Sequence, residues 1–140
     1  MSHNDDLHEL EKIRQLRIQY SHYYDTGDID GIVSLFTEDA IVDAGVHGGA
    51  EGIDNVRAYF AEQREATGRT LHFVSNPRIE LTSENTATGA WYLQDAVIGW
   101  AEAGQPPPVL YGTYSDDYVK VDGEWKFSAF RVSIEAPTEL

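Results

Sequence analysis

A carboxylate and an imidazole that lie far apart in the sequence, Asp25 and His72, have the residue types for acid–base chemistry. Asp25 ends the run YSHYYD (residues 20–25), and His72 lies within TLHFV (residues 70–74). An aspartate bonded to one ring nitrogen of a histidine fixes the tautomer and stabilises the imidazolium, so the other nitrogen can take up a proton near neutral pH. If the fold brings the two side chains together in an apolar pocket, a metal-free acid–base enzyme is predicted.

Each of the two residues also has a structural interpretation. Asp25 could pair with His22, three residues before it, or cap the turn that Thr26 and Gly27 begin. His72 could be a hydrogen-bonded histidine of the core or of a sheet edge. An unpaired charge is costly to bury, so an aspartate that enters a core requires a partner. Spacing in the sequence alone does not identify that partner.

Several other side chains are candidates for a pocket beside this pair. Tyr24 directly precedes Asp25 and shares the apolar stripe of its helix. Arg131 lies between two apolar residues of a strand, where a cation requires a carboxylate partner or a substrate oxygen. Each candidate could equally belong to the core or the surface. The predicted pocket residues are Tyr20, Tyr24, Trp91, Tyr111 and Arg131.

No metal site or cofactor is predicted. His22 and His47 could bind a metal together with Asp25 or Asp43, but the chain has no HxH or HExxH spacing. The Gly48-Gly49 pair lacks both the Lys-Ser/Thr of a phosphate-binding loop and the dinucleotide fingerprint.

Helices are expected first and strands afterwards. Apolar spacing predicts a helix over residues 6–24 that ends at Gly27, and Asp28 is the expected N-cap of a short helix up to about residue 36. A strand (40–44), a glycine-rich loop (45–49) and a third helix (52–66) follow. Four long strands are then predicted, over residues 70–81, 86–100, 109–121 and 124–135, and Asp122-Gly123 is the strongest hairpin signal.

This order indicates an α+β fold, a single domain over residues 1–140, with the helices on one face of a curved sheet. Gly89, Gly99 and Gly112 fall inside predicted strands, where glycine marks bends or close approach by another group. A strongly bent sheet over helices forms a cone with an open mouth, which can hold a small apolar ligand.

The chain is acidic, with 24 Asp and Glu against 10 Lys and Arg and a net charge of −14. Nucleic acids and anionic membranes are bound by basic surfaces, so neither is predicted as a partner.

The N-terminal MSHNDD is unlike a signal peptide, and no apolar run reaches the roughly 18 residues of a membrane span. Without cysteine there is no disulfide or thiolate chemistry, and a cytoplasmic location is expected.

The order of the motifs resembles the SnoaL-like branch of the NTF2-like superfamily, over about residues 8–135. The resemblance is carried by YDTGD (24–28), LFTEDA (35–40), LH (71–72) with SN (75–76), GTY (112–114) and DGEWKF (122–127). It implies a cone in which a strongly curved mixed or antiparallel sheet wraps over about three N-terminal helices.

Within this superfamily the chain is similar to the cofactor-free lyases that include scytalone dehydratases, bile-acid 7α-dehydratases and hexachlorocyclohexane dehydrochlorinases. The resemblance implies that His72 is the base, Asp25 its orienting partner and Tyr24 the proton donor. One difference is that Trp91-Tyr92 stand where a scytalone dehydratase has a second pocket histidine. A tyrosine would then have to act as the acid.

The predicted function is a cofactor-independent lyase, of the dehydratase or dehydrohalogenase type, that acts on a small hydrophobic cyclic molecule. Two alternatives stay open: an isomerase or cyclase that uses the same pair, and a non-catalytic module that binds a small ligand. The resemblance also implies a homo-oligomer, either a trimer or a dimer.

Overall fold

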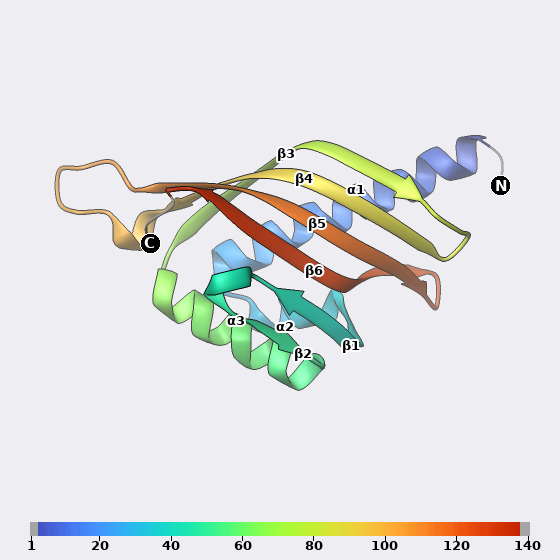
Figure 1. Cartoon of the computed structure of the whole chain (residues 1–140), viewed down its shortest axis with the longest axis horizontal. Helices are drawn as coiled ribbons and strands as arrows, with labels where there is room; N and C mark the ends of the chain where they lie inside the picture. Colours follow the sequence, from blue (N-terminus) through green and yellow to red (C-terminus); the bar gives the residue numbers. More distant parts are fainter. Residues whose placement is uncertain (1–2, 138–140) are drawn as a thin grey trace.

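The computed structural model describes residues 3–137, which form three helices, six strands and two short 3₁₀ turns (Figure 1). In chain order, these elements are α1 (His3–Thr26), α2 (Ile29–Ser34), β1 (Phe36–Asp43), η1 (Gly45–His47), β2 (Gly49–Glu51), α3 (Ile53–Thr67), β3 (Thr70–Leu81), β4 (Thr86–Val97), η2 (Ile98–Trp100), β5 (Val109–Val121) and β6 (Glu124–Ala136).

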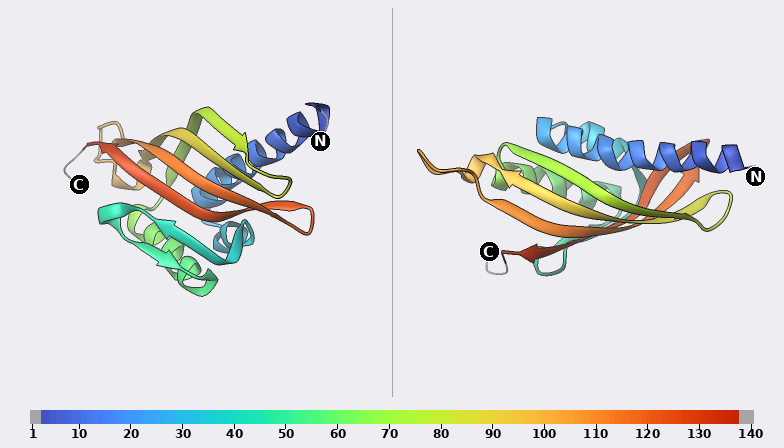
Figure 2. Two further views of the ribbon diagram at one scale, coloured as in Figure 1. Left: turned by 45° about the vertical axis from the view of Figure 1, so that its right-hand side comes forward. Right: turned by 90° about the horizontal axis from the view of Figure 1, so that it is seen from above.

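The six strands form one mixed sheet in the order β2-β1-β6-β5-β4-β3. β1 runs parallel to β6, and the other neighbouring pairs are antiparallel. Helix α1 runs along one face of the sheet (Figure 2), and α3 packs against β1 and β2. This confirms the predicted α+β fold with helices on one face of a mixed sheet.

The end of α1 follows from its sequence. Ile13, Leu16, Tyr20 and Tyr24 recur at helical spacing, and all four are buried. The helix stops at Thr26, because Gly27 takes a φ of 73°, which disfavours residues with a Cβ. The predicted end and the buried stripe of the first helix are therefore confirmed.

Two local signals behave as predicted. The Asp28 side chain accepts a hydrogen bond from the Gly31 N–H at 2.8 Å and caps α2. Asp122 and Gly123 both have positive φ, 51° and 83°, as the tight turn between β5 and β6 requires. The predicted ends of β3 and β5 match the structure.

Two strand predictions are wrong in their bounds, and one strand, β2, was not predicted. The strand expected to end at residue 100 ends at Val97, because Gly99 leaves the sheet and packs on the end of α3, where a Cβ would lie 2.2 Å from the Thr67 carbonyl oxygen. The strand expected to begin at residue 40 begins at Phe36, because Phe36 already pairs with Phe127 of β6. The register of this pairing then shifts between Phe36 and Ile41. Part of the expected glycine-rich loop forms the short strand β2 along β1.

The inner face of the sheet is given by strict alternation along the long strands. On β4 the buried positions are odd-numbered from Ala87 to Val97, and on β5 they are even-numbered from Leu110 to Tyr118. Position 89 is a glycine because the Tyr118 side chain packs directly against it. A Cβ at this position would lie within 3 Å of atoms of Tyr118. Among the described residues, no helix is both long and apolar enough to cross a membrane.

Candidate active site

Asp25 and His72 lie in direct contact. The Nδ1 of His72 is 2.7 Å from Asp25 Oδ1, and the His72 backbone N–H donates to Asp25 Oδ2 at 2.9 Å. Thr70 adds a third hydrogen bond from its hydroxyl, at 2.8 Å. A carboxylate only accepts, so Nδ1 carries the hydrogen of this contact and Nε2 is left to face the other way.

The charge of Asp25 is stabilised where it lies. Burial by itself would raise the pKa of this carboxyl, but the hydrogen bonds from His72 and Thr70 outweigh it and hold the pKa below its usual value. The three bonds satisfy both carboxylate oxygens. Asp25 therefore fixes the orientation of the His72 ring rather than taking up a proton. The contact with His22 that the sequence left open is not made.

The helix end that carries Asp25 is held by two arginines. Arg64 of α3 donates to the Tyr24 carbonyl at 3.0 Å, and Arg69 donates to the Asp25 carbonyl at 2.9 Å. The last carbonyls of a helix lack partners within the helix and carry partial negative charge, so cations are favourable there. This cap, made by side chains from outside α1, fixes the position of the Asp25 carboxylate against β3.

A second carboxylate lies on the opposite side of the imidazole. Asp95 is directly opposite His72 in the pairing of β3 with β4, and its Oδ2 is 3.4 Å from His72 Nε2. Burial raises the pKa of Asp95, the charge of Asp25 adds to this effect, and His72 opposes it. Asp95 Oδ1 is buried with no hydrogen-bond partner among the described residues. The imidazole thus lies between two carboxyl groups whose pKa values are shifted in opposite directions, that of Asp25 downward and that of Asp95 upward.

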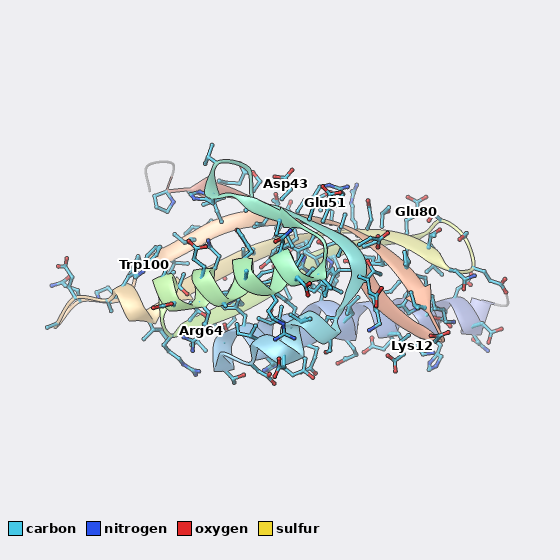
Figure 3. All side chains as sticks on the ribbon, turned by 90° about the horizontal axis from the view of Figure 1, so that it is seen from below. Lys12, Asp43, Glu51, Arg64, Glu80 and Trp100 are labelled. Atoms are coloured by element: carbon cyan, nitrogen blue, oxygen red, sulfur yellow. The ribbon has the colours of Figure 1, made fainter. Side chains whose placement is uncertain are left out.

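His72 and Asp95 open into a pocket of about 150 Å³. Aromatic rings form much of its wall, which also includes Thr67 at the end of α3 and Trp100 of η2. Trp100 of η2 donates its indole N–H to the Ala66 carbonyl at 3.0 Å, and Figure 3 shows it near the same end of α3 as Arg64. A cavity of this size lined by apolar side chains holds one six-membered ring.

Two of the predicted pocket tyrosines line this cavity. Tyr24 lies with its ring 4.8 Å from the His72 ring, and its hydroxyl is 3.0 Å from Thr67 Oγ1. Burial raises the pKa of Tyr24 to about 12. Tyr20 is 3 % exposed and also lines the pocket. The rings of Tyr20 and Tyr24 therefore both lie next to the His72 ring.

The other three predicted pocket residues lie elsewhere, and for them the expectation is corrected. Trp91 faces the core, where its indole N–H donates to the Tyr118 hydroxyl at 3.0 Å. Tyr111 is 47 % exposed on the outer face of the sheet, to which its odd position on β5 directs it. Arg131 pairs with Asp117 at 3.0 Å and lines a separate groove of about 420 Å³.

The site has two residues that the sequence reasoning missed, Asp95 and Tyr114. Both occupy inward positions of strands that otherwise alternate between buried and exposed residues. The sequence pattern that could have identified Asp95 is its position in β4, two residues from both Leu93 and Val97, which places an acidic side chain on the same face of the strand as these two apolar ones. On the next strand Asp95 lies opposite His72, whereas Tyr92 lies opposite Ser75, three residues further along β3.

The site does not have the geometry of a metal centre. The two carboxylates lie on opposite sides of the imidazole, so their oxygens do not converge with a ring nitrogen on one point. Among residues 3–137, no group of three or more His, Cys, Asp or Glu side chains is arranged to hold a metal ion.

Solved structures share this fold over nearly the whole chain. A candidate scytalone dehydratase from Novosphingobium aromaticivorans is 29% identical, with a TM-score of 0.85 over 96% of this chain and 89% of that one. The hexachlorocyclohexane dehydrochlorinase LinA-type3 from Novosphingobium barchaimii is 19% identical, with a TM-score of 0.82 over 96% and 91%. A Nostoc punctiforme protein of unknown function with a cystatin-like fold is 19% identical, with a TM-score of 0.80 over 98% and 96%.

The sequence itself matches a family model over most of its length. The model describes the SnoaL-like domain, and the match covers residues 5–131, from the first turns of α1 to the middle of β6. The matched segment includes every residue of the pocket described above except those at the end of β6. The chain belongs to the SnoaL-like domain family.

Proposed function

We propose that this protein is a cofactor-independent lyase that removes a proton from carbon and expels water or halide from a small hydrophobic ring compound. One observation carries the proposal: Asp25 binds Nδ1 of His72, and Nε2 of the same ring faces an apolar pocket. The similarity to a candidate dehydratase at 29% identity supports the reaction class.

In this mechanism His72 Nε2 takes the proton as the C–H bond breaks, and Asp25 stabilises the imidazolium that forms. The electron pair of the broken bond forms the C=C bond, and the leaving group departs with its own bonding pair. A leaving hydroxyl needs a proton to depart as water. Asp95, whose neutral form burial favours, supplies that proton in our account. Tyr24 is the second candidate, but its hydroxyl is already bonded to Thr67.

The reaction is tested by the mass of the product. The enzyme is incubated in deuterated water with cyclic β-hydroxy ketones and with chlorinated cyclohexanes, and the products are analysed by mass spectrometry. We expect a product lighter by one water or one HCl. A product of unchanged formula that carries deuterium would instead establish the isomerase alternative. Neither turnover nor deuterium uptake with any compound would leave only the non-catalytic binding module.

Replacing Asp95 with asparagine is expected to lower the turnover of hydroxylated substrates by about 10²-fold, since general acids contribute about 10²–10⁴-fold. The free energy of unfolding, in contrast, should be higher for Asp95→Asn than for the wild type. Because the folded-state pKa of Asp95 is raised, ionising it weakens the wild-type fold as pH rises above the usual carboxyl range. The advantage of Asp95→Asn in urea unfolding should therefore be larger at pH 7 than at pH 4.

The control for this variant is Glu80→Gln, the same acid-to-amide change at an exposed position of β3. It should change neither turnover nor the pH dependence of unfolding. Unchanged turnover in Asp95→Asn would remove Asp95 from the mechanism and return Tyr24 as the donor.

We further expect a homo-oligomer. Phe73, Tyr92 and Tyr111 are 56, 58 and 47 % exposed on the outer faces of three adjacent strands. Tyr92 lies opposite Ser75 and Thr113, and Tyr111 lies opposite Gln94, so the nearest cross-strand neighbours of these rings are uncharged. Arg78 and Glu135 lie at the border of this surface. Light scattering of Tyr92→Lys would show dissociation if this face joins the subunits.

A further inference from the structure

Two of the residues that line the pocket beside His72 are exposed, Ala66 and Trp100. The other lining residues that the structure describes are buried or partly buried. Ala66 lies in the last turn of α3, and Trp100 ends η2, the turn that follows β4. Figure 3 shows Trp100 at the same end of α3 as Arg64. We call Ala66 and Trp100 the mouth of the pocket.

The Trp100 side chain spans this mouth. Its indole N–H donates to the Ala66 carbonyl at 3.0 Å, so the ring joins η2 to α3. Trp100 is 42 % exposed and also lines the pocket, so one part of the indole faces solvent and another part faces the cavity. Ala66 contributes only a methyl group. The bulk at the mouth therefore comes from one side chain.

The backbone next to Trp100 is held more firmly than its side chain. The Gly99 N–H donates to the Arg69 carbonyl at 2.9 Å. Gly99 also lies so close to the end of α3 that a Cβ would overlap the Thr67 carbonyl oxygen. The indole, in contrast, is held by a single neutral hydrogen bond between partly exposed groups, which is weak. A ligand therefore reaches the pocket by rotation of the indole rather than by movement of η2.

The size of the cavity can increase only at the mouth without disturbing the core. Its other sides are formed by buried side chains of the sheet, among them Leu93, Leu110 and Phe130. Trp100 is the lining side chain that is both large and exposed. Burial of more apolar surface favours a larger apolar ligand until the wall excludes it. The position of this limit thus depends on the Trp100 ring.

We propose that Trp100 sets the size limit of the pocket. Its indole, bonded to the Ala66 carbonyl, closes the mouth, so the pocket holds a single six-membered ring and excludes fused two-ring molecules. The inference deepens the proposed function, on which it rests, because it restricts the substrates to monocyclic compounds. Trp100 selects ligands by its volume and takes no part in the proton transfer at His72.

The size limit is tested by binding alone, with fluorobenzene and fluoronaphthalene as uncharged probes of one and two rings. Fluorine NMR titration gives both affinities, and the ¹⁵N resonances of the His72 ring report whether a probe occupies this pocket. The wild type should bind fluorobenzene more tightly, although fluoronaphthalene has more apolar surface. Trp100→Ala should bind fluoronaphthalene about tenfold more tightly than the wild type does, because the second ring is then accommodated.

Two further variants make this result specific. Trp100→Phe retains part of the ring volume and loses the N–H, so its affinity for fluoronaphthalene should lie between those of the wild type and Trp100→Ala. The matched control is Ile98→Ala, which shortens another apolar side chain of η2 that is 37 % exposed and does not line the pocket. It should bind both probes as the wild type does. Circular dichroism spectra check that each variant is folded.

Three results would overturn the proposal. The first is an equal affinity of the wild type and the folded Trp100 variants for fluoronaphthalene in this pocket. The second is a wild type that prefers the two-ring probe, and the third is a wild type that does not bind fluorobenzene at millimolar concentration.

Failure of the size limit and failure of the lyase give different results, because the probes need no turnover. If Trp100→Ala gains affinity for fluoronaphthalene but no compound is turned over, the size limit stands and the lyase is wrong. If the wild type turns over monocyclic and fused-ring substrates with equal kcat/KM, the lyase stands and the size limit is wrong.

Discussion

Alanine in place of His72 is expected to lower kcat/KM for elimination by about 10²–10⁴-fold, because the proton then has no acceptor in the pocket. Among the residues of the pocket wall, His72 is the one base whose free nitrogen faces the cavity while its other nitrogen is held by a carboxylate. The reaction is followed by the rate of product formation in the mass-spectrometric assay. The fold should be retained, because the Thr70–Asp25 hydrogen bond and the backbone bond to Asp25 do not involve the His72 side chain.

Asp25→Asn should lose nearly as much activity, although it leaves the imidazole in place. An asparagine can present its amide NH₂ to Nδ1, which puts the ring hydrogen on Nε2 and blocks the base. The double variant should be no slower than His72→Ala, since the two residues act as one unit. Tyr111→Phe, outside the pocket, should keep wild-type activity. If His72→Ala retains its rate within about threefold, the base has been assigned to the wrong residue.

Replacing Arg17 with methionine is expected to cost about 3–5 kcal/mol in the free energy of unfolding. Arg17 and Asp116 are both fully buried, and the guanidinium makes two hydrogen bonds to the carboxylate, at 2.5 and 3.1 Å. Methionine fills the volume but leaves the Asp116 charge buried without its cation. Urea unfolding followed by fluorescence gives the loss, which should appear as a lower midpoint.

Two further variants identify the source of this loss. Arg14→Met, on the same helix, breaks an ion pair with Glu11 whose side chains are about half exposed, and should cost less than about 1 kcal/mol. Arg17→Met combined with Asp116→Asn should recover part of the loss, because asparagine carries no charge and still accepts from Tyr118. A cost below about 1 kcal/mol for Arg17→Met alone would contradict the buried pair.

Much of the fold follows from local signals in the sequence. The apolar stripe of α1, the cap at Asp28 and the Asp122-Gly123 turn each depend on residues within a few positions of one another, and each is confirmed. The errors occur where distant residues decide the structure. β1 starts early because β6 pairs with it, and β4 stops at Val97 because Gly99 packs on the end of α3.

In the site too, the features that depend on distant residues could not be predicted from local sequence. The contact between Asp25 and His72 joins residues 47 positions apart, and spacing alone left it open until the resemblance to a family supported it. Asp95 depends on the register of β3 with β4, which sets it opposite His72. Tyr111 and Arg131 were predicted in the pocket from residue type, but strand alternation and the bulges of β5 and β6 direct them outward.

The protonation state of the His72 ring tests the central claim without any substrate. ¹⁵N NMR of labelled protein at neutral pH distinguishes a protonated ring nitrogen from a bare one. Our account predicts that Nδ1 is protonated toward Asp25 and that Nε2 is bare, with this preference lost in Asp25→Asn. A ring protonated at Nε2 throughout the neutral range, either as the other tautomer or as imidazolium, would have no free nitrogen to accept a proton and would contradict the account.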